Sequence, residues 1–322
     1  MHPPESRMPH TDTLTPTIRR VAIVGAGTIG ASWAALFLAH GLEVVVSDPA
    51  SDAEAQTRAR VQAAWPVLKE LGRVADGASP DALRFEPDLT LALAGVDFVQ
   101  ENAPEREDFK IDLFARMDAI LPPHVIVASS SSGLIMSRLQ SRCQHAGRFV
   151  IGHPFNPPHL IPLVEVVGGD QTSASTVDRS IAFYQAMGKY PIRLNKEVPG
   201  HIANRLQAAL WREAIHLAAE NVASVADIDA AVSQGPGLRW ALFGPHMTFN
   251  LGGGAGGMAN FMDHLLGPVQ SWWDDLGAPA VTPELQKRLI EGVNAEAGQR
   301  SIADLVETRD AQLTALLKTL QR

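Results

Sequence analysis

Apolar residues in the first half of the chain fall into short runs rich in Val and Ile, separated by stretches of helical periodicity. A helix is expected over about 27–40, directly after the first run. Strands that are apolar throughout and alternate with helices are typical of a parallel sheet covered on both faces. The pattern therefore predicts an α/β fold with a doubly wound parallel sheet. The expected strands are 21–24, 42–47, 96–100, 125–128, 149–152 and 163–167.

Beyond Pro199-Gly200 almost every apolar pattern is helical. Two helix starts are recognisable there, because Thr282 precedes a Pro and an acidic residue, and Ser301 lies three residues before Asp304. The second half is therefore expected to be all-helical. Its first helix is expected to have one apolar face, which comprises Ile202, Leu206, Ala209, Leu210 and Leu217.

The length of 322 residues fits two domains. The change of pattern near residue 198 predicts a domain boundary there, with an α/β domain over 18–198 and a helical domain over 199–322. Residues 1–17 contain four Pro and five Ser or Thr, and we expect them to be a disordered tail. This tail has no apolar run after a basic start, so it is not expected to be a secretory signal.

Acidic residues outnumber basic ones, 35 against 27, for a net charge of −8. Such a protein is not expected to bind nucleic acid or an anionic membrane. Cys143 is the only cysteine, which excludes an internal disulfide and a cysteine-rich metal site, and no metal is expected. The chain has no run of about 18 apolar residues, so no membrane-spanning helix is expected. These properties favour a cytoplasmic protein.

A glycine-rich turn follows the first expected strand and opens the first helix. It comprises Gly25, Ala26, Gly27, Thr28, Ile29 and Gly30. Asp48 then follows the second strand, and this order is the dinucleotide-binding fingerprint of a Rossmann-type sheet. The first glycine permits the tight turn, the second lets the backbone approach a pyrophosphate, and the third allows close packing of helix on strand. The start of the helix supplies N–H groups for the phosphates.

Asp48 favours NAD over NADP as the cofactor. Its carboxylate can accept hydrogen bonds from the ribose hydroxyls and would repel a 2′-phosphate, and Pro49 follows it where an Arg would suit NADP. A glycine-rich turn with no cofactor is the alternative, which the flanking strand, helix and acidic residue disfavour.

Three further motifs carry a family resemblance. They are 129–133 (SSSSG), 153–158 (HPFNPP) followed by 163–166 (LVEV), and 198–206 (VPGHIANRL). With these motifs the chain resembles the L-3-hydroxyacyl-CoA dehydrogenase family, from about Val21 to the C-terminus. The resemblance implies an NAD-dependent enzyme that reversibly oxidises a 3-hydroxy group to a 3-ketone. It also implies a homodimer formed through the helical domain.

Oxidation of a secondary alcohol by hydride transfer requires a base for the hydroxyl proton. Histidine suits this task at neutral pH, and a buried carboxylate on its other ring nitrogen fixes the tautomer and stabilises the imidazolium. His153 and Glu165 are candidates for such a pair, because Glu165 lies in an apolar strand where a charge needs a partner. The resemblance implies the same roles for both. A capping histidine and a solvated glutamate are the alternatives.

The resemblance also implies roles for polar residues in or near the other motifs. Ser132 and Asn204 match family residues that orient the substrate oxygen and the histidine, and Ser132 is expected at the cofactor as well. Glu105 and Asn156 match contacts to the nicotinamide half of the cofactor, and Lys110 matches another cofactor contact. A polar turn at Ser132 and a helix cap at Asn204 are the alternatives.

Two departures from the family pattern bear on the substrate. Enzymes of the family that act on acyl-CoA hold its adenosine end partly with a Ser and a Lys, which fall here on about Ala64 and Leu71. The stretch 235–245 is similar to the branch that contains lambda-crystallin (L-gulonate 3-dehydrogenase) and L-carnitine dehydrogenase, whose members oxidise small free 3-hydroxy acids. Arg239 is then a candidate for binding a substrate carboxylate, with a salt bridge as the alternative.

We therefore expect a small free 3-hydroxy acid of the L-gulonate, L-carnitine or 3-hydroxybutyrate type, with a CoA thioester of fatty-acid metabolism as the alternative. Trp240, Trp272 and Trp273 could hold a quaternary ammonium on their faces, or serve as core or dimer contacts. His201 stands where the family motif usually has an apolar residue. It is either a neutral substitution or a residue of the substrate pocket.

Two other functions are disfavoured. A non-catalytic NAD-binding protein of the crystallin type does not need the pair His153 and Glu165. Dehydrogenases of the 3-hydroxyisobutyrate or 6-phosphogluconate type use a Lys near the start of the helical domain. Here Lys196 lies before the boundary and the corresponding helix carries Asn204.

Overall fold

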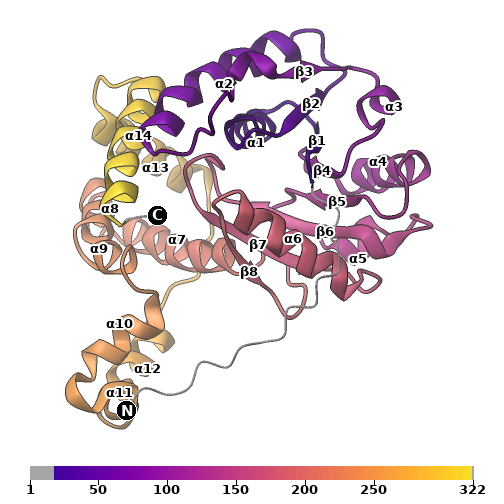
Figure 1. Cartoon of the computed structure of the whole chain (residues 1–322). Helices are drawn as coiled ribbons and strands as arrows, with labels where there is room; N and C mark the ends of the chain where they lie inside the picture. The colour runs from indigo at the N-terminus through magenta and orange to yellow at the C-terminus, as the bar shows by residue number, and fades with distance from the viewer. Residues whose placement is uncertain (1–17, 321–322) are drawn as a thin grey trace, which may run out of the picture. The chain divides into compact units, whose positions relative to one another are not determined.

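The protein is described by a computed structural model over residues 18–320, so the tail expected over 1–17 lies outside the described residues. The chain divides into two compact units between His201 and Ile202. The first unit is a sheet with helices on its faces, and the second consists of helices (Figure 1).

The first unit is built on one sheet of eight strands in the order β3-β2-β1-β4-β5-β6-β7-β8. The strands are β1 (Arg20–Val24), β2 (Glu43–Ser47), β3 (Arg84–Phe85), β4 (Phe98–Glu101), β5 (Ile126–Ser129), β6 (Phe149–Pro154), β7 (Leu163–Gly168) and β8 (Tyr190–Arg193). All six expected strands are present, and the expected doubly wound α/β fold is confirmed. The strand order switches between β1 and β4, and ligands of such sheets bind outside the carboxyl ends of the strands at this switch point.

One strand pairing departs from the expected parallel arrangement. β7 runs antiparallel to β6, and β8 is parallel to β7. The connection over 155–162 is too short for the crossover that parallel neighbours need, so the chain turns directly back along β6. The two strands that the sequence pattern missed are short: β3 has two residues, and β8 is an edge strand that contains Pro191.

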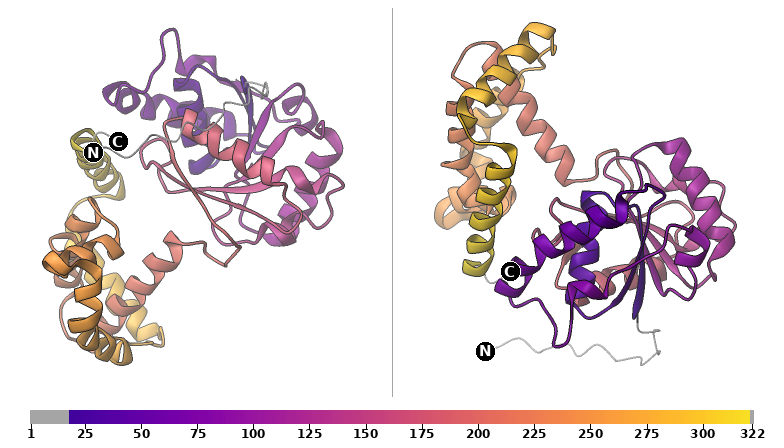
Figure 2. Two further views of the ribbon diagram at one scale, coloured as in Figure 1. Left: turned by 60° about the horizontal axis from the view of Figure 1, so that its bottom comes forward. Right: turned by 90° about the horizontal axis from the view of Figure 1, so that it is seen from above.

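Helices cover both faces of the sheet (Figure 2). Because successive side chains of a strand point to opposite faces, Val21 and Ile23 of β1 pack into one core with helices α1, α2 and α6. Ala22 and Val24 pack into a second core with α3, α4 and α5. These helices are α1 (Thr28–Ala39), α2 (Ala53–Glu70), α3 (Leu89–Ala92), α4 (Glu107–Ile120), α5 (Met136–Leu139) and α6 (Ala174–Ala186).

The second unit is helical in all its described elements. They are α7 (Ala203–Ala219), α8 (Val225–Ser233), α9 (Pro236–Trp240), α10 (Pro245–Gly252), α11 (Gly257–His264), α12 (Leu266–Asp275), α13 (Pro283–Ala297) and α14 (Ile302–Thr319). The two expected helix starts are confirmed. The Thr282 hydroxyl accepts a hydrogen bond from the Leu285 N–H, and Ser301 and Asp304 cap each other's backbone reciprocally. No helix within 18–320 is long and apolar enough to cross a membrane.

The apolar face of α7 is only partly covered. Ile215 and Ala218, toward the end of the helix, are buried. Leu206, Leu210 and Trp211 are 57%, 40% and 66% exposed in the described chain. The expected helix is therefore present, while the first half of its apolar face remains on the surface of this chain.

Candidate active site

The glycine-rich turn lies at the switch point, between the end of β1 and the start of α1. Gly25 has a φ of +98°, and a Cβ there would lie 2.6 Å from the carbonyl oxygen of Asn102. A Cβ at Gly30 would overlap the Gly25 carbonyl, so both positions require glycine. A Cβ at Gly27 would meet no atom within 4 Å. The backbone is therefore open at the helix start, which fits a dinucleotide pyrophosphate.

Asp48, which follows β2, holds this turn from the side. Its Oδ2 accepts a hydrogen bond from the N–H of Ala26 at 2.8 Å, and its Oδ1 accepts one from the N–H of Ala50 at 2.9 Å. The turn contact is a role that the sequence pattern did not predict. Each carboxylate oxygen can accept a second hydrogen bond, so this contact is compatible with the expected ribose contact.

A buried ion pair lies beside the turn. Lys110 Nζ is 2.6 Å from Glu101 Oε1, and both side chains are buried. The Ser129 hydroxyl and the Ala103 N–H also donate to Glu101, at 2.5 Å and 2.6 Å. The sequence pattern missed Glu101, although an acidic residue in an apolar strand signals a buried partner. Lys110 Nζ also lies 3.7 Å from Glu105 Oε2, so the buried ammonium attracts the negative charge of the partly exposed Glu105.

Glu105 binds the serine loop that follows β5. Its Oε1 accepts hydrogen bonds from the Ser131 hydroxyl at 2.7 Å, the Ser132 N–H at 2.8 Å and the Gly133 N–H at 3.0 Å. Burial by itself raises the pKa of Glu105, but these three donors and the charge of Lys110 together hold it below its usual value. Glu105 is therefore an ionised group that ties two loops of the site together.

His153 and Glu165 form a buried pair. The register of β6 and β7 places them opposite each other, and His153 Nδ1 lies 2.9 Å from Glu165 Oε2. The side chain of His153 is 6% exposed and that of Glu165 is fully buried. Because a carboxylate accepts a hydrogen bond here, Nδ1 carries the proton and Nε2 remains as the basic nitrogen. The structure brings together the two residues expected as base and partner.

His201 lies beside this pair. Its ring centroid is 5.2 Å from that of His153, with the ring planes 43° apart, and its Nε2 lies 3.1 Å from the carbonyl oxygen of Ser131. Only 2% of His201 is exposed. Burial lowers the pKa of His201 and the charge of His153 lowers it further, against the opposing effects of the Ser131 carbonyl, Glu165 and Glu105. The structure therefore places His201 within the site.

Ser132 and Asn156 lie at the exposed side of the same region, after β5 and β6. The Ser132 hydroxyl lies 3.3 Å from Glu105 Oε1. Asn156 precedes a cis peptide bond to Pro157 and follows His153 by three residues. Both expected contact residues are therefore accessible to a ligand at the carboxyl ends of the strands.

Two family models match the chain. The 3-hydroxyacyl-CoA dehydrogenase NAD binding domain covers 20–198, and the 3-hydroxyacyl-CoA dehydrogenase C-terminal domain covers 200–293. The chain belongs to the 3-hydroxyacyl-CoA dehydrogenase family. It is an NAD-dependent oxidoreductase of this family that acts on the CH–OH group of a 3-hydroxy acid.

Relatives of this dehydrogenase match it over nearly their whole length. An L-carnitine dehydrogenase from Streptomyces coelicolor is 52% identical over 305 residues, which cover 95% of this chain and 96% of that protein. An L-carnitine dehydrogenase from Nocardiopsis dassonvillei is 50% identical and covers 96% and 94%. One from Pseudomonas aeruginosa is 46% identical and covers 94% of each.

Solved structures agree with this family. The crystal structure of 5-formyl-3-hydroxy-2-methylpyridine 4-carboxylic acid 5-dehydrogenase, described as an NAD+ dependent dismutase, has a TM-score of 0.81 and 31% identity, and covers 95% of this chain and 99% of that one. An (S)-3-hydroxybutyryl-CoA dehydrogenase from Ralstonia eutropha has a TM-score of 0.61 and 32% identity, and covers 67% and 77%.

The remaining expected residues of the dehydrogenase lie in its second unit. Asn204 is in the first turn of α7 and half-buried, and Arg239 is in the last turn of α9 and exposed. Trp240, Trp272 and Trp273 are exposed as well. The alternative that these three tryptophans form the core of the chain is therefore wrong.

The position that would carry the Ser of acyl-CoA enzymes is not accessible in this family member. Ala64 is buried, and it packs into the core beneath α2. Leu71, at the second of these positions, follows the end of α2 and carries no charge.

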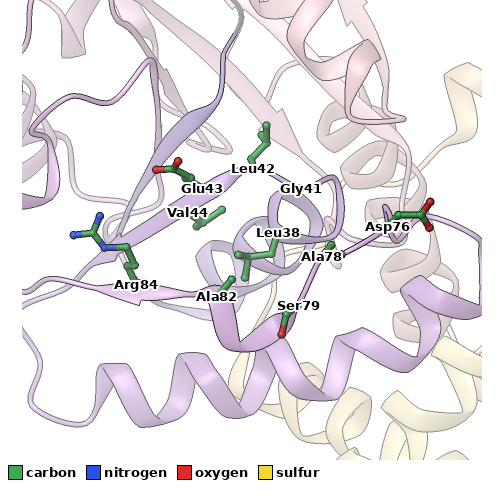
Figure 3. A pocket seen from close by; sticks show the side chains of 11 residues that line it. Leu38, Gly41, Leu42, Glu43, Val44, Asp76, Ala78, Ser79, Ala82 and Arg84 are labelled. Atoms are coloured by element: carbon green, nitrogen blue, oxygen red, sulfur yellow. The ribbon is translucent and has the colours of Figure 1, made fainter.

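A surface pocket lies away from the site. It has a volume of about 360 Å³, and Leu38, Glu43, Asp76, Ser79 and Arg84 contribute to its lining (Figure 3). Glu43 is the first residue of β2, whereas Asp48 follows the last residue of this strand. The pocket is therefore at the amino end of the strands, opposite to the end that carries the glycine-rich turn.

Proposed function

We propose that the protein is an L-carnitine dehydrogenase, which oxidises the 3-hydroxy group of L-carnitine to a ketone. The observation that carries this proposal is the identity to proteins of that name, 52% to 43% over 93% or more of this chain. L-carnitine is a small free 3-hydroxy acid, which agrees with the absence of a polar side chain at Ala64.

In this proposal His153 is the general base. Its Nε2 takes the proton of the substrate hydroxyl, and the Glu165 carboxylate stabilises the imidazolium that forms. The 2.9 Å contact and the full burial of Glu165 support this role, since a charge-assisted hydrogen bond is strong where water is excluded. NAD, when bound, accepts the hydride from the carbon that carries the hydroxyl.

Three further residues bind the substrate in this proposal. Ser132 and Asn204 orient the hydroxyl oxygen toward His153 through their hydroxyl and amide groups. Arg239 pairs with the carboxylate of the free acid, because its planar guanidinium can donate two parallel hydrogen bonds. Its exposure in the described chain supports this role, since an exposed guanidinium is accessible to a ligand.

The cofactor is held by the first unit. The turn from Gly25 to Gly30 receives the pyrophosphate, and Asp48 accepts hydrogen bonds from the ribose and excludes the 2′-phosphate of NADP. Glu105 and Asn156 contact the nicotinamide half, and Ser132 contributes to the same contact. Lys110 acts through Glu105, because its ammonium is buried beneath that carboxylate.

We also propose that two copies of the chain associate through their second units. Leu206, Leu210 and Trp211 form an exposed apolar strip on one helix, and Trp272 and Trp273 are exposed on another. Exposed apolar surfaces of this kind mark protein interfaces. Light scattering of the purified protein is expected to give about twice the 34.6 kDa chain mass. A single-chain mass at micromolar concentration would contradict the dimer.

A substrate panel tests the function. Formation of NADH is measured with L-carnitine, D-carnitine, L-gulonate, L-3-hydroxybutyrate and L-3-hydroxybutyryl-CoA, with NAD or NADP. We expect the highest kcat/KM with L-carnitine and NAD. Oxidation of the CoA thioester alone would overturn the free-acid substrate, and preference for L-gulonate or 3-hydroxybutyrate would overturn carnitine.

Arg239→Met tests the carboxylate contact in the same assay. We expect KM for the free acid to rise by about 10-fold to 100-fold, the size of a lost charge-assisted hydrogen bond pair. Arg142→Met removes another exposed Arg, which pairs with Asp112, and it serves as the matched control. Equal KM values for the two variants would show that Arg239 does not bind the substrate carboxylate.

A further inference from the structure

His201 occupies an unfavourable position that its own contacts do not explain. Its φ is +50°, a left-handed conformation that most side chains avoid. Its Nδ1 is a buried side-chain nitrogen with no hydrogen-bond partner among residues 18–320. Left-handed backbone and an unpaired buried acceptor each destabilise the folded chain. Two such penalties at one residue beside His153 indicate a role in function.

The side chain of His201 contacts both His153 and the serine loop. On one side its ring packs against the ring of His153, at a centroid distance of 5.2 Å. On the other side its Nε2 lies 3.1 Å from the carbonyl oxygen of Ser131. The hydroxyl of Ser131 donates to Glu105, which also accepts from the Ser132 N–H. His201 therefore spans the space between His153 and the serine loop.

The contact with Ser131 decides the protonation state of His201. A carbonyl oxygen only accepts hydrogen bonds, so Nε2 of His201 carries a proton and a neutral ring has its lone pair on Nδ1. The ionisable groups that face His201 are His153 on β6, Glu165 on β7 and Glu105 before α4. Glu165 is already paired with His153 and Glu105 with the serine loop.

We propose that His201 is a positioning residue that remains neutral while His153 gains and loses a proton, and that holds His153 at a fixed distance from the serine loop. The inference rests on the proposed role of His153 as the base. A neutral His201 ring packs against His153 and does not repel the positive charge that His153 carries as an imidazolium. A protonated His201 places a second positive charge beside His153 and prevents it from taking the substrate proton.

The protonation state is tested first, on the wild-type protein without substrate. Nuclear magnetic resonance of ¹⁵N-histidine-labelled protein reports which ring nitrogen carries the proton. We expect the Nε2-protonated neutral form of His201, with protonation below the usual histidine pKa of about 6.5. A charged His201 at pH 7, or an Nδ1-protonated tautomer, would overturn the proposal. This arm does not depend on which acid is the substrate.

Two variants then separate the ring from the hydrogen bond. His201→Asn tolerates the left-handed backbone and can donate to Ser131, but lacks the ring. His201→Phe keeps a ring against His153 but lacks the donor. We expect kcat to fall by about 10-fold to 100-fold in both, the scale of a displaced catalytic group, with KM for NAD changed less than twofold. His124→Asn, an exposed histidine, is the control with wild-type kinetics.

The pH dependence provides a readout that a packing role would not move. In the wild type log(kcat/KM) is expected to fall at acid pH with a limiting slope of 2, because protonation of either histidine stops the reaction. Both variants are expected to show a slope of 1, since His153 alone remains. A slope of 1 in the wild type, or variants with wild-type kcat, would overturn the proposal. If L-carnitine is not oxidised, the same profile is measured with the acid that is.

Discussion

His153 and Glu165 lie directly opposite each other on neighbouring antiparallel strands, with Nδ1 and Oε2 2.9 Å apart. Residues opposed in this way point to the same face of a sheet. The pair is thus positioned by the hydrogen-bond register of β6 and β7, and no loop has to close to form it. A one-residue shift of β7 would place Val164 or Val166 opposite His153.

Substitution of either member of the pair is expected to stop turnover while NAD binding persists. His153→Gln removes the base, and we expect kcat to fall by about 10²-fold to 10⁴-fold. Glu165→Gln keeps the shape but removes the charge that stabilises the imidazolium, and a loss of similar order is expected. NAD binding is measured by fluorescence titration. Wild-type turnover in His153→Gln would refute the proposed base.

Glu105→Gln tests the carboxylate that binds the serine loop. Gln can still accept hydrogen bonds from the Ser132 and Gly133 N–H groups, but it lacks the charge that faces Lys110. We expect Kd for NAD to rise by about 10-fold, the effect of one charge-assisted contact of about 1.4 kcal/mol. Glu107→Gln, which breaks an exposed ion pair with Arg138, is the control. Equal Kd values in the two variants would place Glu105 outside the cofactor site.

Gly152→Ala is expected to destabilise the first unit. A Cβ at Gly152 would overlap the hydroxyl of Tyr184, which donates to Gln100 Oε1 at 2.6 Å in the core. We expect the free energy of unfolding to drop by about 1–3 kcal/mol in urea titrations. The double variant with Tyr184→Phe removes the overlapping oxygen and is expected to lose less than the sum of the single losses.

The matched control for this substitution is Gly133→Ala, where a Cβ meets no atom within 4 Å. Its free energy of unfolding is expected to change by less than about 0.5 kcal/mol. Strictly additive losses in the Gly152 and Tyr184 double variant would show that the overlap is not the cause.

Lys189 predicts a pH dependence of stability. Its ammonium donates to the carbonyl oxygens of Pro158 and Ile161 and lies 5.2 Å from the ring of Trp33. Burial, with a smaller effect of Arg73, lowers the pKa of Lys189 from 10.5 to about 7. Between these two values the unfolded chain binds more protons than the folded one, so the contribution of Lys189 to stability rises with pH.

Burial of the Lys189 ammonium lowers the free energy of unfolding by its full amount below about pH 7, and this loss disappears above pH 10.5. Lys189→Met is expected to remove this rise from the free energy of unfolding, measured in urea at intervals across the same pH range. Lys196→Met alters an exposed lysine and is expected to leave the rise unchanged. An identical pH dependence in wild type and Lys189→Met would contradict the lowered pKa.

The long apolar strands and the glycine-rich turn could be predicted from sequence, because each carries its signal within a few consecutive residues. β3 and β8 could not, because a two-residue strand and an edge strand with a Pro have no alternation to detect. The antiparallel direction of β7 depends on the length of the connection over 155–162, which the strand pattern alone does not use.

The site could be predicted as a set of residues but not as an arrangement. The contact of His153 with Glu165 depends on strand register, and that of His201 with Ser131 depends on a left-handed backbone turn. Neither is encoded in spacing. Glu101 is detectable in principle, as an acid within an apolar strand. Its partner Lys110 is not, because the resemblance marks Lys110 as a cofactor contact and gives no sign of the ion pair.

The strand order has a consequence for folding during synthesis of the chain. β2 and β3 extend the sheet from one edge of β1, and β4 to β8 are added in turn from the other edge. No later strand has to enter between two that are already paired, so the sheet can grow during synthesis from the N-terminus. The glycine-rich turn, Asp48 and Glu105 are made first, whereas His153, Glu165 and His201 follow. A nascent chain therefore contains the turn proposed to bind the pyrophosphate before it contains the pair proposed to transfer the proton.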